Sequence, residues 1–97
     1  MKGYVVECFW PGVSEDKLDS VVRRAAAVAD ELRLDGGKVE FRGTILMLGD
    51  ETVFHLFEGV EADVRAVSER AGVRYERVLE SVLIGEPRIA EGGSNAS

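Results

Sequence analysis

The chain has 97 residues, of which 45% are hydrophobic and 31% are charged, and its net charge at pH 7 is −6. These values are typical of one globular domain with a modest core, and they exclude an intrinsically disordered chain. The acidic balance argues against nucleic acids and anionic membranes as partners, because both attract a basic surface.

The first two elements are a strand and a long helix. Residues 4–10 alternate and are rich in β-branched and aromatic side chains, which predicts a strand that ends at Pro11-Gly12. Apolar residues then recur at spacings of three and four over 15–34, as on the buried stripe of an amphipathic helix. Ser14 stands at the N-cap position of this helix. The chain therefore opens with a β-α unit.

Two strands, a helix and a last strand follow. Alternating runs at 38–48 and 52–58 predict a β-hairpin, with a bend expected at Gly43. A second amphipathic run at 61–71 predicts a shorter helix, and a short apolar run at 79–84 predicts the final strand. The order β-α-β-β-α-β is the ferredoxin-like arrangement, an α+β fold in which a four-stranded antiparallel sheet carries both helices on one face.

The predicted sheet has apolar residues on both of its faces, although the helices can cover only one. We assign residues 1–88 to this domain and the small, polar residues 89–97 to a disordered tail. An uncovered apolar face normally marks a contact with a partner. We therefore expect a homodimer of the dimeric α/β-barrel type, in which two sheet faces meet around a cavity.

The alternation of side chains along each strand assigns residues to the two faces. Because a buried charge is costly, the face beneath the helices is expected to be apolar: Val6, Cys8, Val39, Phe41, Ile45, Met47, Phe54 and Leu56. The opposite face then carries a mixed set: Val5, Glu7, Phe9, Glu40, Arg42, Thr44, Val53, His55 and Phe57. A β-bulge near Gly43 would change this register.

Glu7 and His55 form the best candidate site in this arrangement. Their strands are neighbours in the ferredoxin-like order, so the two side chains are expected to lie side by side. A carboxylate beside an imidazole can orient a general base or hold a ligand, and a structural pair in a dimer interface is the alternative. The tentative catalytic residues are therefore His55 and Glu7. The predicted ligand-binding residues are Glu7, Phe9, Trp10, Arg42, His55 and Phe57.

Three functions are compatible with this site. The first is binding of a small, apolar or aromatic organic molecule within the dimer. The second is a cofactor-free enzyme, such as a monooxygenase, isomerase or cyclase, with His55 as the base and Glu7 as its orienting group. The third is binding of a divalent metal by Glu7, His55 and Glu40. The sequence leaves the cofactor unknown, and it has no phosphate-binding loop and no dinucleotide fingerprint.

Two stretches resemble a known family. The segments "YVVECFWPGVSEDKL" and "VFHLFEGVEADVRAVSERAGVRYERVLES" are similar to the small ferredoxin-like proteins grouped as domain of unknown function 4242. The resemblance covers roughly residues 3–85 and implies a domain of the dimeric barrel type. Some members bind nickel through histidines at the end of the second helix. This chain has Ser68 and Val73 at the matching positions, so the resemblance transfers no metal ligand to it.

The remaining features concern the compartment. The single cysteine, Cys8, cannot form an internal disulfide, and it is expected to be a small buried hydrophobic residue without catalytic reactivity. No hydrophobic signal segment precedes the first strand, and no stretch approaches the ~20 apolar residues of a membrane span. We therefore expect a cytoplasmic protein.

Overall fold

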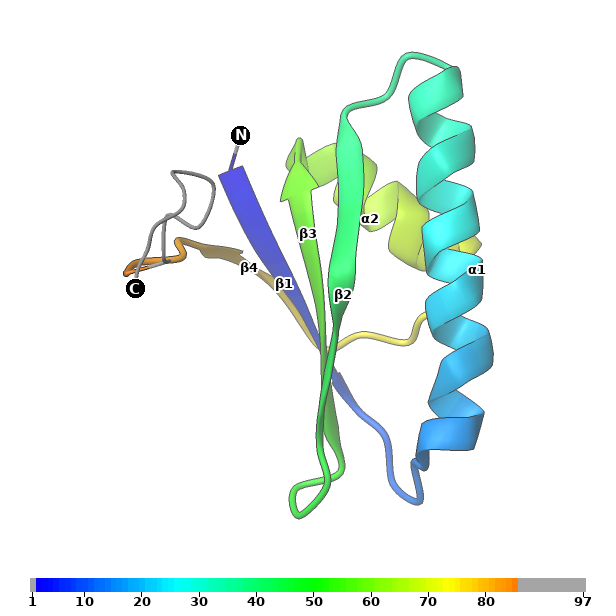
Figure 1. Ribbon diagram of the computed structural model, residues 1–97, viewed down its shortest axis with the longest axis vertical. Coiled ribbons are helices and arrows are strands. Elements are labelled where there is room, and N and C mark those ends of the chain that lie inside the picture. The colour runs from blue at the N-terminus through cyan, green and yellow to red at the C-terminus, as the bar shows by residue number, and fades with distance from the viewer. Residues whose placement is uncertain (1, 86–97) are drawn as a thin grey trace, which may run out of the picture.

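The computed structural model describes residues 2–85, so the tail predicted at 89–97 lies outside the described residues. It contains six elements in the predicted order: β1 (Lys2–Phe9), α1 (Glu15–Leu34), β2 (Val39–Met47), β3 (Thr52–Gly59), α2 (Glu61–Arg70) and β4 (Arg77–Ser81). The strands form one antiparallel sheet in the order β2-β3-β1-β4. Figure 1 shows both helices on the same side of this sheet. The ferredoxin-like prediction is confirmed.

Both helices begin and end close to the predicted residues. The hydroxyl of Ser14 accepts a hydrogen bond of 3.3 Å from the backbone N–H of Lys17, which confirms the predicted cap of α1. The side chain of Arg24 on α1 donates a 2.7 Å hydrogen bond to the carbonyl of Ala71, at the end of α2. This bond ties the two helices together over the sheet. Neither helix has the length and hydrophobicity that crossing a bilayer requires, within the described part of the chain.

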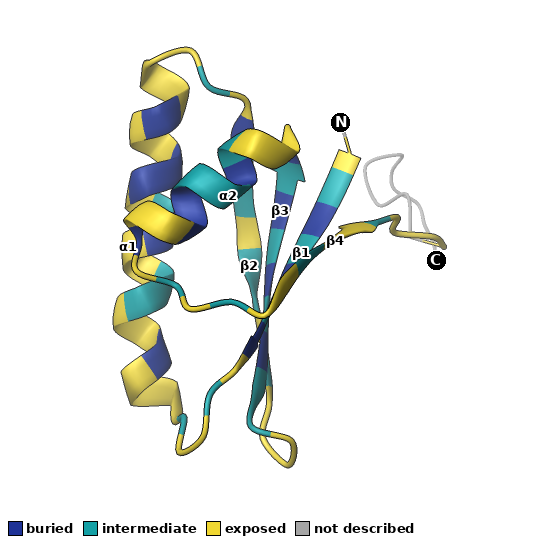
Figure 2. Cartoon of the chain, turned by 180° about the vertical axis from the view of Figure 1, so that it is seen from behind, coloured by how far each residue is buried: buried dark blue, intermediate teal, exposed yellow. Residues whose placement is uncertain are grey.

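The core lies between the helices and the sheet, and β1 contributes the side chains that the alternation predicts. Val6 and Cys8 are buried beneath the helices, as expected. Figure 2 shows buried residues along β1 and β3, where the helices cover the sheet. From α1, the buried residues are Leu18, Ala25, Val28, Ala29 and Leu32.

The face assignment of β3 is wrong by one residue. In β1, Val6 pairs with His55, and the ring of His55 is only 2% exposed beneath the helices. Val53 and Phe57 are buried on the same side, whereas Phe54 and Leu56 are only partly buried on the opposite face. The prediction failed because both faces of β3 carry large apolar residues, so that only the polarity of histidine distinguished them. A neutral imidazole can be buried once it is hydrogen-bonded.

A β-bulge changes the face assignment of β2. The register shifts between Phe41 and Gly43, which leaves Arg42 as the extra residue. Phe41 is directed toward the core as predicted, but beyond the bulge Thr44 lies beneath the helices opposite His55. The predicted burial of Ile45 and Met47 is wrong, because both belong to the uncovered face and are exposed.

The last strand lies earlier in the chain than predicted. Pairing with β1 fixes β4 at Arg77–Ser81, two residues before the apolar run at 79–84 begins. Val82, Leu83 and Ile84 follow the strand and are exposed. An apolar run is therefore a poor guide here, because its last residues lie beyond the residues that pair with β1.

Candidate functional site

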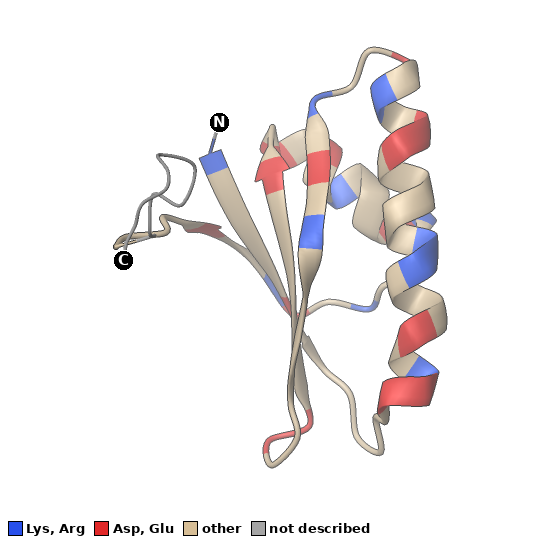
Figure 3. Ribbon diagram, in the orientation of Figure 1, with Lys and Arg blue, Asp and Glu red and all other residues tan. Residues whose placement is uncertain are grey.

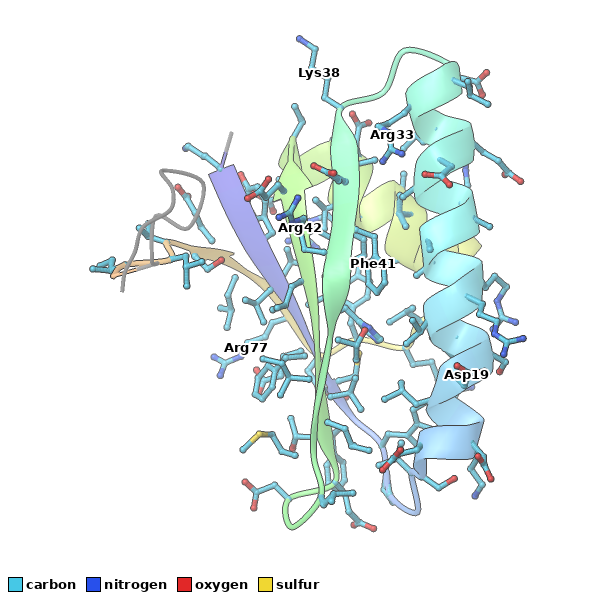
Figure 4. The ribbon with its side chains drawn as sticks, in the orientation of Figure 1. Asp19, Arg33, Lys38, Phe41, Arg42 and Arg77 are labelled. Atoms are coloured by element: carbon cyan, nitrogen blue, oxygen red, sulfur yellow. The ribbon has the colours of Figure 1, made fainter. Side chains whose placement is uncertain are left out.

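The structure separates the two residues of the predicted site. Glu7 pairs across the sheet with Phe54, on the uncovered face, while His55 lies on the helix-covered face. Glu7 instead accepts a hydrogen bond from Arg77 of β4 and forms an ion pair with it. In Figure 4 the labelled Arg77 lies on the side of the sheet away from α1. The predicted Glu7–His55 constellation is therefore wrong.

Arg42 and Phe57 do not join His55 in a site either. Arg42 is the bulge residue and forms an ion pair of 3.4 Å with Glu40, whereas Phe41 is directed toward α1 (Figure 4). Phe57 is buried in the core, where its ring lies 5.3 Å from the ring of Phe41. Phe57 therefore has a packing role in the core.

A pocket of about 370 Å³ lies on the helix side of the sheet, at the end of β1. It is lined by Cys8, Phe9, Trp10, Pro11, Val21, His55, Gly72, Val73 and Arg74. These residues come from β1 and the loop that follows it, from α1, from β3 and from the segment after α2. Three of the predicted ligand-binding residues, Phe9, Trp10 and His55, therefore do meet in one cavity.

Backbone contacts hold the two loops that form the pocket walls. The N–H of Trp10 donates a 2.8 Å hydrogen bond to the carbonyl of Glu51 in the β2–β3 turn. The N–H of Gly12 donates a bond of the same length to the Glu51 carboxylate. On the other wall, the N–H of Val73 donates to the carbonyl of Ser68 at 2.9 Å, which closes the end of α2. Such anchored walls favour a pocket that is formed before a ligand arrives.

His55 provides the polar group in the wall of this pocket. Its Nδ1 shares a 2.8 Å hydrogen bond with Oγ1 of Thr44, which is its one hydrogen-bond partner within residues 2–85. Burial lowers the pKa of His55 from 6.5 to about 4, so the imidazole is neutral at pH 7. A neutral imidazole held by one nitrogen can offer its other nitrogen to a ligand or act as a general base.

Cys8 shares the pocket with His55, but its chemistry is that of a buried thiol. Burial raises the pKa of Cys8 to about 12, with smaller contributions from the carboxylates of Glu76 and Glu7. We expect the native protein at pH 8 to react with a small maleimide roughly 1,000-fold more slowly than free cysteine does, because only the thiolate reacts. Stopped-flow labelling in buffer and in denaturant measures this ratio. A native rate close to that of free cysteine would contradict it.

The described residues contain no group of three or more His, Cys, Asp and Glu side chains that could hold a metal ion. Ser68 is fully buried, and its hydroxyl donates a 2.9 Å hydrogen bond to the carbonyl of Val64. Val73 lines the pocket with an apolar side chain. The two positions that match the nickel-binding histidines of the resembling family therefore have packing roles.

Several wall residues were not predicted as site residues. Cys8 was expected in the core, where it does lie, but its contact with a cavity has no sequence signal. Val21 belongs to the apolar stripe of α1, and Val73 and Arg74 follow the end of α2. Gly72 follows the end of α2, and its position opposite the end of β1 depends on the tertiary fold.

No protein-family model matches the sequence, and no curated protein sequence matches it significantly. Among solved structures, the fold is similar to that described as "Crystal structure analysis of SCO4226 from Streptomyces coelicolor A3(2)". The TM-score is 0.67 at 24% sequence identity, and the alignment covers 84% of this chain and 96% of that one. The two proteins share the ferredoxin-like α+β fold.

Proposed function

We propose that this protein binds a small, mainly apolar organic molecule in the helix-side pocket. The observation that carries the proposal is the position of His55, a buried and neutral imidazole in the wall of a cavity of about 370 Å³. A concave apolar site with a few polar groups is the usual form of a small-molecule site. A cytoplasmic location is part of the proposal, because Cys8 is buried and unpaired.

The proposed site differs from the one expected between two sheets. That expectation required Glu7 and His55 on one face, and the register of β1 and β3 places them on opposite faces. On the uncovered face, Glu7 is already paired with Arg77. The helix-side pocket keeps His55, Phe9 and Trp10 as ligand-binding residues and replaces Glu7, Arg42 and Phe57.

The lining suggests the chemistry of the ligand. Trp10, Pro11 and Val73 offer aromatic and aliphatic surface, which favours an aromatic or aliphatic body. Arg74 adds a guanidinium, and no carboxylate within residues 2–85 forms an ion pair with it. The second nitrogen of His55 adds a hydrogen-bonding group. An aromatic molecule with one anionic group fits these three features.

Anilinonaphthalene sulfonate (ANS) has this chemistry, and Trp10 is the single tryptophan of the chain. We expect ANS to bind and to quench Trp10 emission by energy transfer. Val21→Phe fills the pocket from α1 and should weaken binding by at least about tenfold, and Arg74→Gln should weaken it by about three- to tenfold. Fluorescence titration at constant ionic strength measures each affinity.

The control is Leu79→Ser, which removes apolar surface from the opposite face of the sheet. This variant should bind ANS as the native protein does. If Leu79→Ser lost affinity while Val21→Phe kept it, ANS would be bound to the uncovered face and the proposed pocket site would be wrong. If the pocket variants weaken ANS binding as expected, competition by a series of aromatic carboxylates would rank ligands for the pocket.

Catalysis is a second candidate, and the Thr44–His55 hydrogen bond favours it. Thr44 takes the orienting role that was expected of Glu7, because it holds Nδ1 and leaves the other nitrogen for a substrate. An enzyme would deplete a compound from a metabolite extract, and His55→Gln would abolish that depletion. A binding protein would retain a compound unchanged. Mass spectrometry of the extract before and after incubation separates the two functions.

A further inference from the structure

The helix-side pocket has an uncharged inner end and a cation at its mouth. His55 and Cys8 form the inner end, because they are only 2% and 4% exposed. Arg74 lines the same cavity but is exposed, so it lies at the mouth. Trp10 and Val73 are half-buried, which places them between the two ends. A ligand in this cavity therefore meets different chemistry at its two ends.

We propose that the pocket holds a ligand with two different polar ends in one orientation: a neutral hydrogen-bond acceptor such as a carbonyl group at His55, and an anionic group at Arg74. The inference rests on the pocket function proposed above, and it adds a second polar group to the ligand and a direction to its binding. His55 is then the residue that determines specificity, because its Nε2–H donates a hydrogen bond to the ligand. An aromatic ring between the two ends of the ligand would lie against Trp10.

The hydrogen bond with Thr44 selects which nitrogen of His55 carries the proton. Within residues 2–85 the Thr44 hydroxyl has one hydrogen-bond partner, Nδ1 of His55, at 2.8 Å. If Nδ1 were protonated and donated to Oγ1, both the hydroxyl proton and the Nε2 lone pair would have no partner in this part of the chain. If the hydroxyl donates to Nδ1, only the Nε2–H has none. The second arrangement leaves fewer polar groups unsatisfied, so Nε2 is the donor.

This Nε2–H is a buried donor for which the described part of the chain provides no acceptor. Such groups are rare in folded proteins, because burial removes their hydrogen bonds to water and nothing replaces them. His55 lines the cavity, so a molecule bound there can provide the missing acceptor. The unsatisfied donor therefore indicates an oxygen or nitrogen acceptor at the inner end of the ligand.

The inner end favours a neutral acceptor over an anion. The imidazole is neutral at pH 7, because burial lowers the pKa of His55 to about 4. Burial also raises the pKa of Cys8 to about 12, so its thiol is protonated, and the carboxylates of Glu76 and Glu7 add to this increase. The same two carboxylates make the electrostatic potential at the sulfur more negative. An anion at this end would be buried without a cation, which is costly.

The mouth favours an anion. Figure 3 shows a basic segment (blue) in the connection between α2 and β4, to which Arg74 belongs. Arg74 takes part in none of the ion pairs that residues 2–85 form. Its guanidinium presents two parallel N–H donors that match the two oxygens of a carboxylate. An anion at the exposed mouth also keeps part of its hydration, so it avoids the cost of full burial.

Three para-substituted benzoates test the inner end by displacement of ANS from the full-length protein. Para-acetylbenzoate places a carbonyl at His55, whereas para-isopropylbenzoate has nearly the same shape and no acceptor there. We expect the acetyl compound to bind at least about tenfold more tightly, because the isopropyl group leaves the Nε2–H unpaired. Hydrophobic burial alone would give the opposite order, since isopropyl is the more apolar group. Terephthalate, with a carboxylate at both ends, should bind at least about tenfold more weakly than para-acetylbenzoate.

Two variants test the orientation, and circular dichroism verifies that both are folded. His55→Leu removes the donor and should abolish the preference for the acetyl compound. Arg74→Gln should weaken both monocarboxylates by about three- to tenfold and keep the ratio of their affinities. A preference that survives His55→Leu, or one that Arg74→Gln removes, would overturn the proposed orientation.

A nuclear magnetic resonance measurement on the native protein depends on no variant. The chain has one histidine, so long-range nitrogen–proton correlation spectra of the untagged protein contain the signals of a single imidazole. We expect a proton on Nε2 and none on Nδ1 at pH 7. A proton on Nδ1 with none on Nε2 would overturn the role of His55 as the donor.

The two proposals fail in different ways. If the pocket is not the binding site, Val21→Phe leaves ANS binding unchanged. If the pocket binds ANS but the ligand orientation is wrong, Val21→Phe weakens ANS binding, while the acetyl and isopropyl compounds bind equally. Failure of para-acetylbenzoate to displace ANS at millimolar concentration would also overturn the inference about the ligand.

Discussion

Between pH 6.5 and pH 4 the native protein is expected to lose about 3 kcal/mol of its free energy of unfolding through His55 alone. The folded state keeps the imidazole neutral because burial lowers its pKa to about 4, while the unfolded chain titrates near 6.5. Within this window the unfolded state therefore binds the additional proton. The contribution of His55 is fully present above pH 6.5 and is lost as the pH falls toward 4.

Urea unfolding at a series of pH values measures this loss. The sequence contains one histidine, so His55→Gln removes the only imidazole and keeps a polar group near Thr44. The variant should be less stable at pH 7, but its stability should change little between pH 6.5 and 5, where few carboxylates titrate. Parallel pH profiles for the native protein and His55→Gln would show that His55 has an ordinary pKa and is accessible to water.

The sequence predicted the helices and strands better than it predicted which face of each strand is buried. The helices were predicted closely because an apolar stripe with a cap fixes both their period and their start, as Ser14 does for α1. A strand with apolar residues on both faces has no comparable signal. In β3, Phe54 and Leu56 alternate with Val53 and Phe57, so either face could have been the buried one.

The bulge that changes the face assignment of β2 also makes the burial of His55 possible. The bulge at Arg42 rotates the rest of β2, which brings Thr44 to the helix side and directly opposite His55. Without this bulge, a buried His55 would lack the hydroxyl that satisfies its Nδ1. The polar appearance of histidine suggested exposure, but its burial depends on a partner that only the bulge supplies. The sequence analysis considered a bulge near Gly43 without connecting it to His55.

The pocket could not be predicted, because its walls come together only in the folded chain. Trp10 and Val21 are separated along the sequence from Val73 and Arg74 by the hairpin and α2. Alternation along one strand places residues on a face, but it gives no information about the loops beyond the strand ends. The predicted site therefore included Phe9 and Trp10 at the end of β1, but it did not include Arg74 after α2.

Gly59→Ala is expected to cost the protein at least about 3 kcal/mol of stability, although it adds a single methyl group. Gly59 ends β3 with a φ angle of +141°, a conformation that residues with a side chain rarely adopt. A Cβ atom at this position would lie 2.1 Å from the carbonyl oxygen of Lys38 and 2.8 Å from the Cα of Val39. Both contacts are with backbone, so no side-chain rotation can relieve them.

The clash occurs where β2 joins the sheet. The carbonyl of Lys38 also accepts a 2.8 Å hydrogen bond from the N–H of Val60, and Val39 pairs with Gly59. A displacement of Lys38 would therefore disrupt the start of β2 and the entry into α2 together. Gly49→Ala is the matched control, because a Cβ there meets nothing within 4 Å, and it should change stability by less than about 0.5 kcal/mol. Thermal and urea unfolding of both variants test the pair. Equal stabilities would show that the β2–β3 contact is looser at Gly59 than this packing requires.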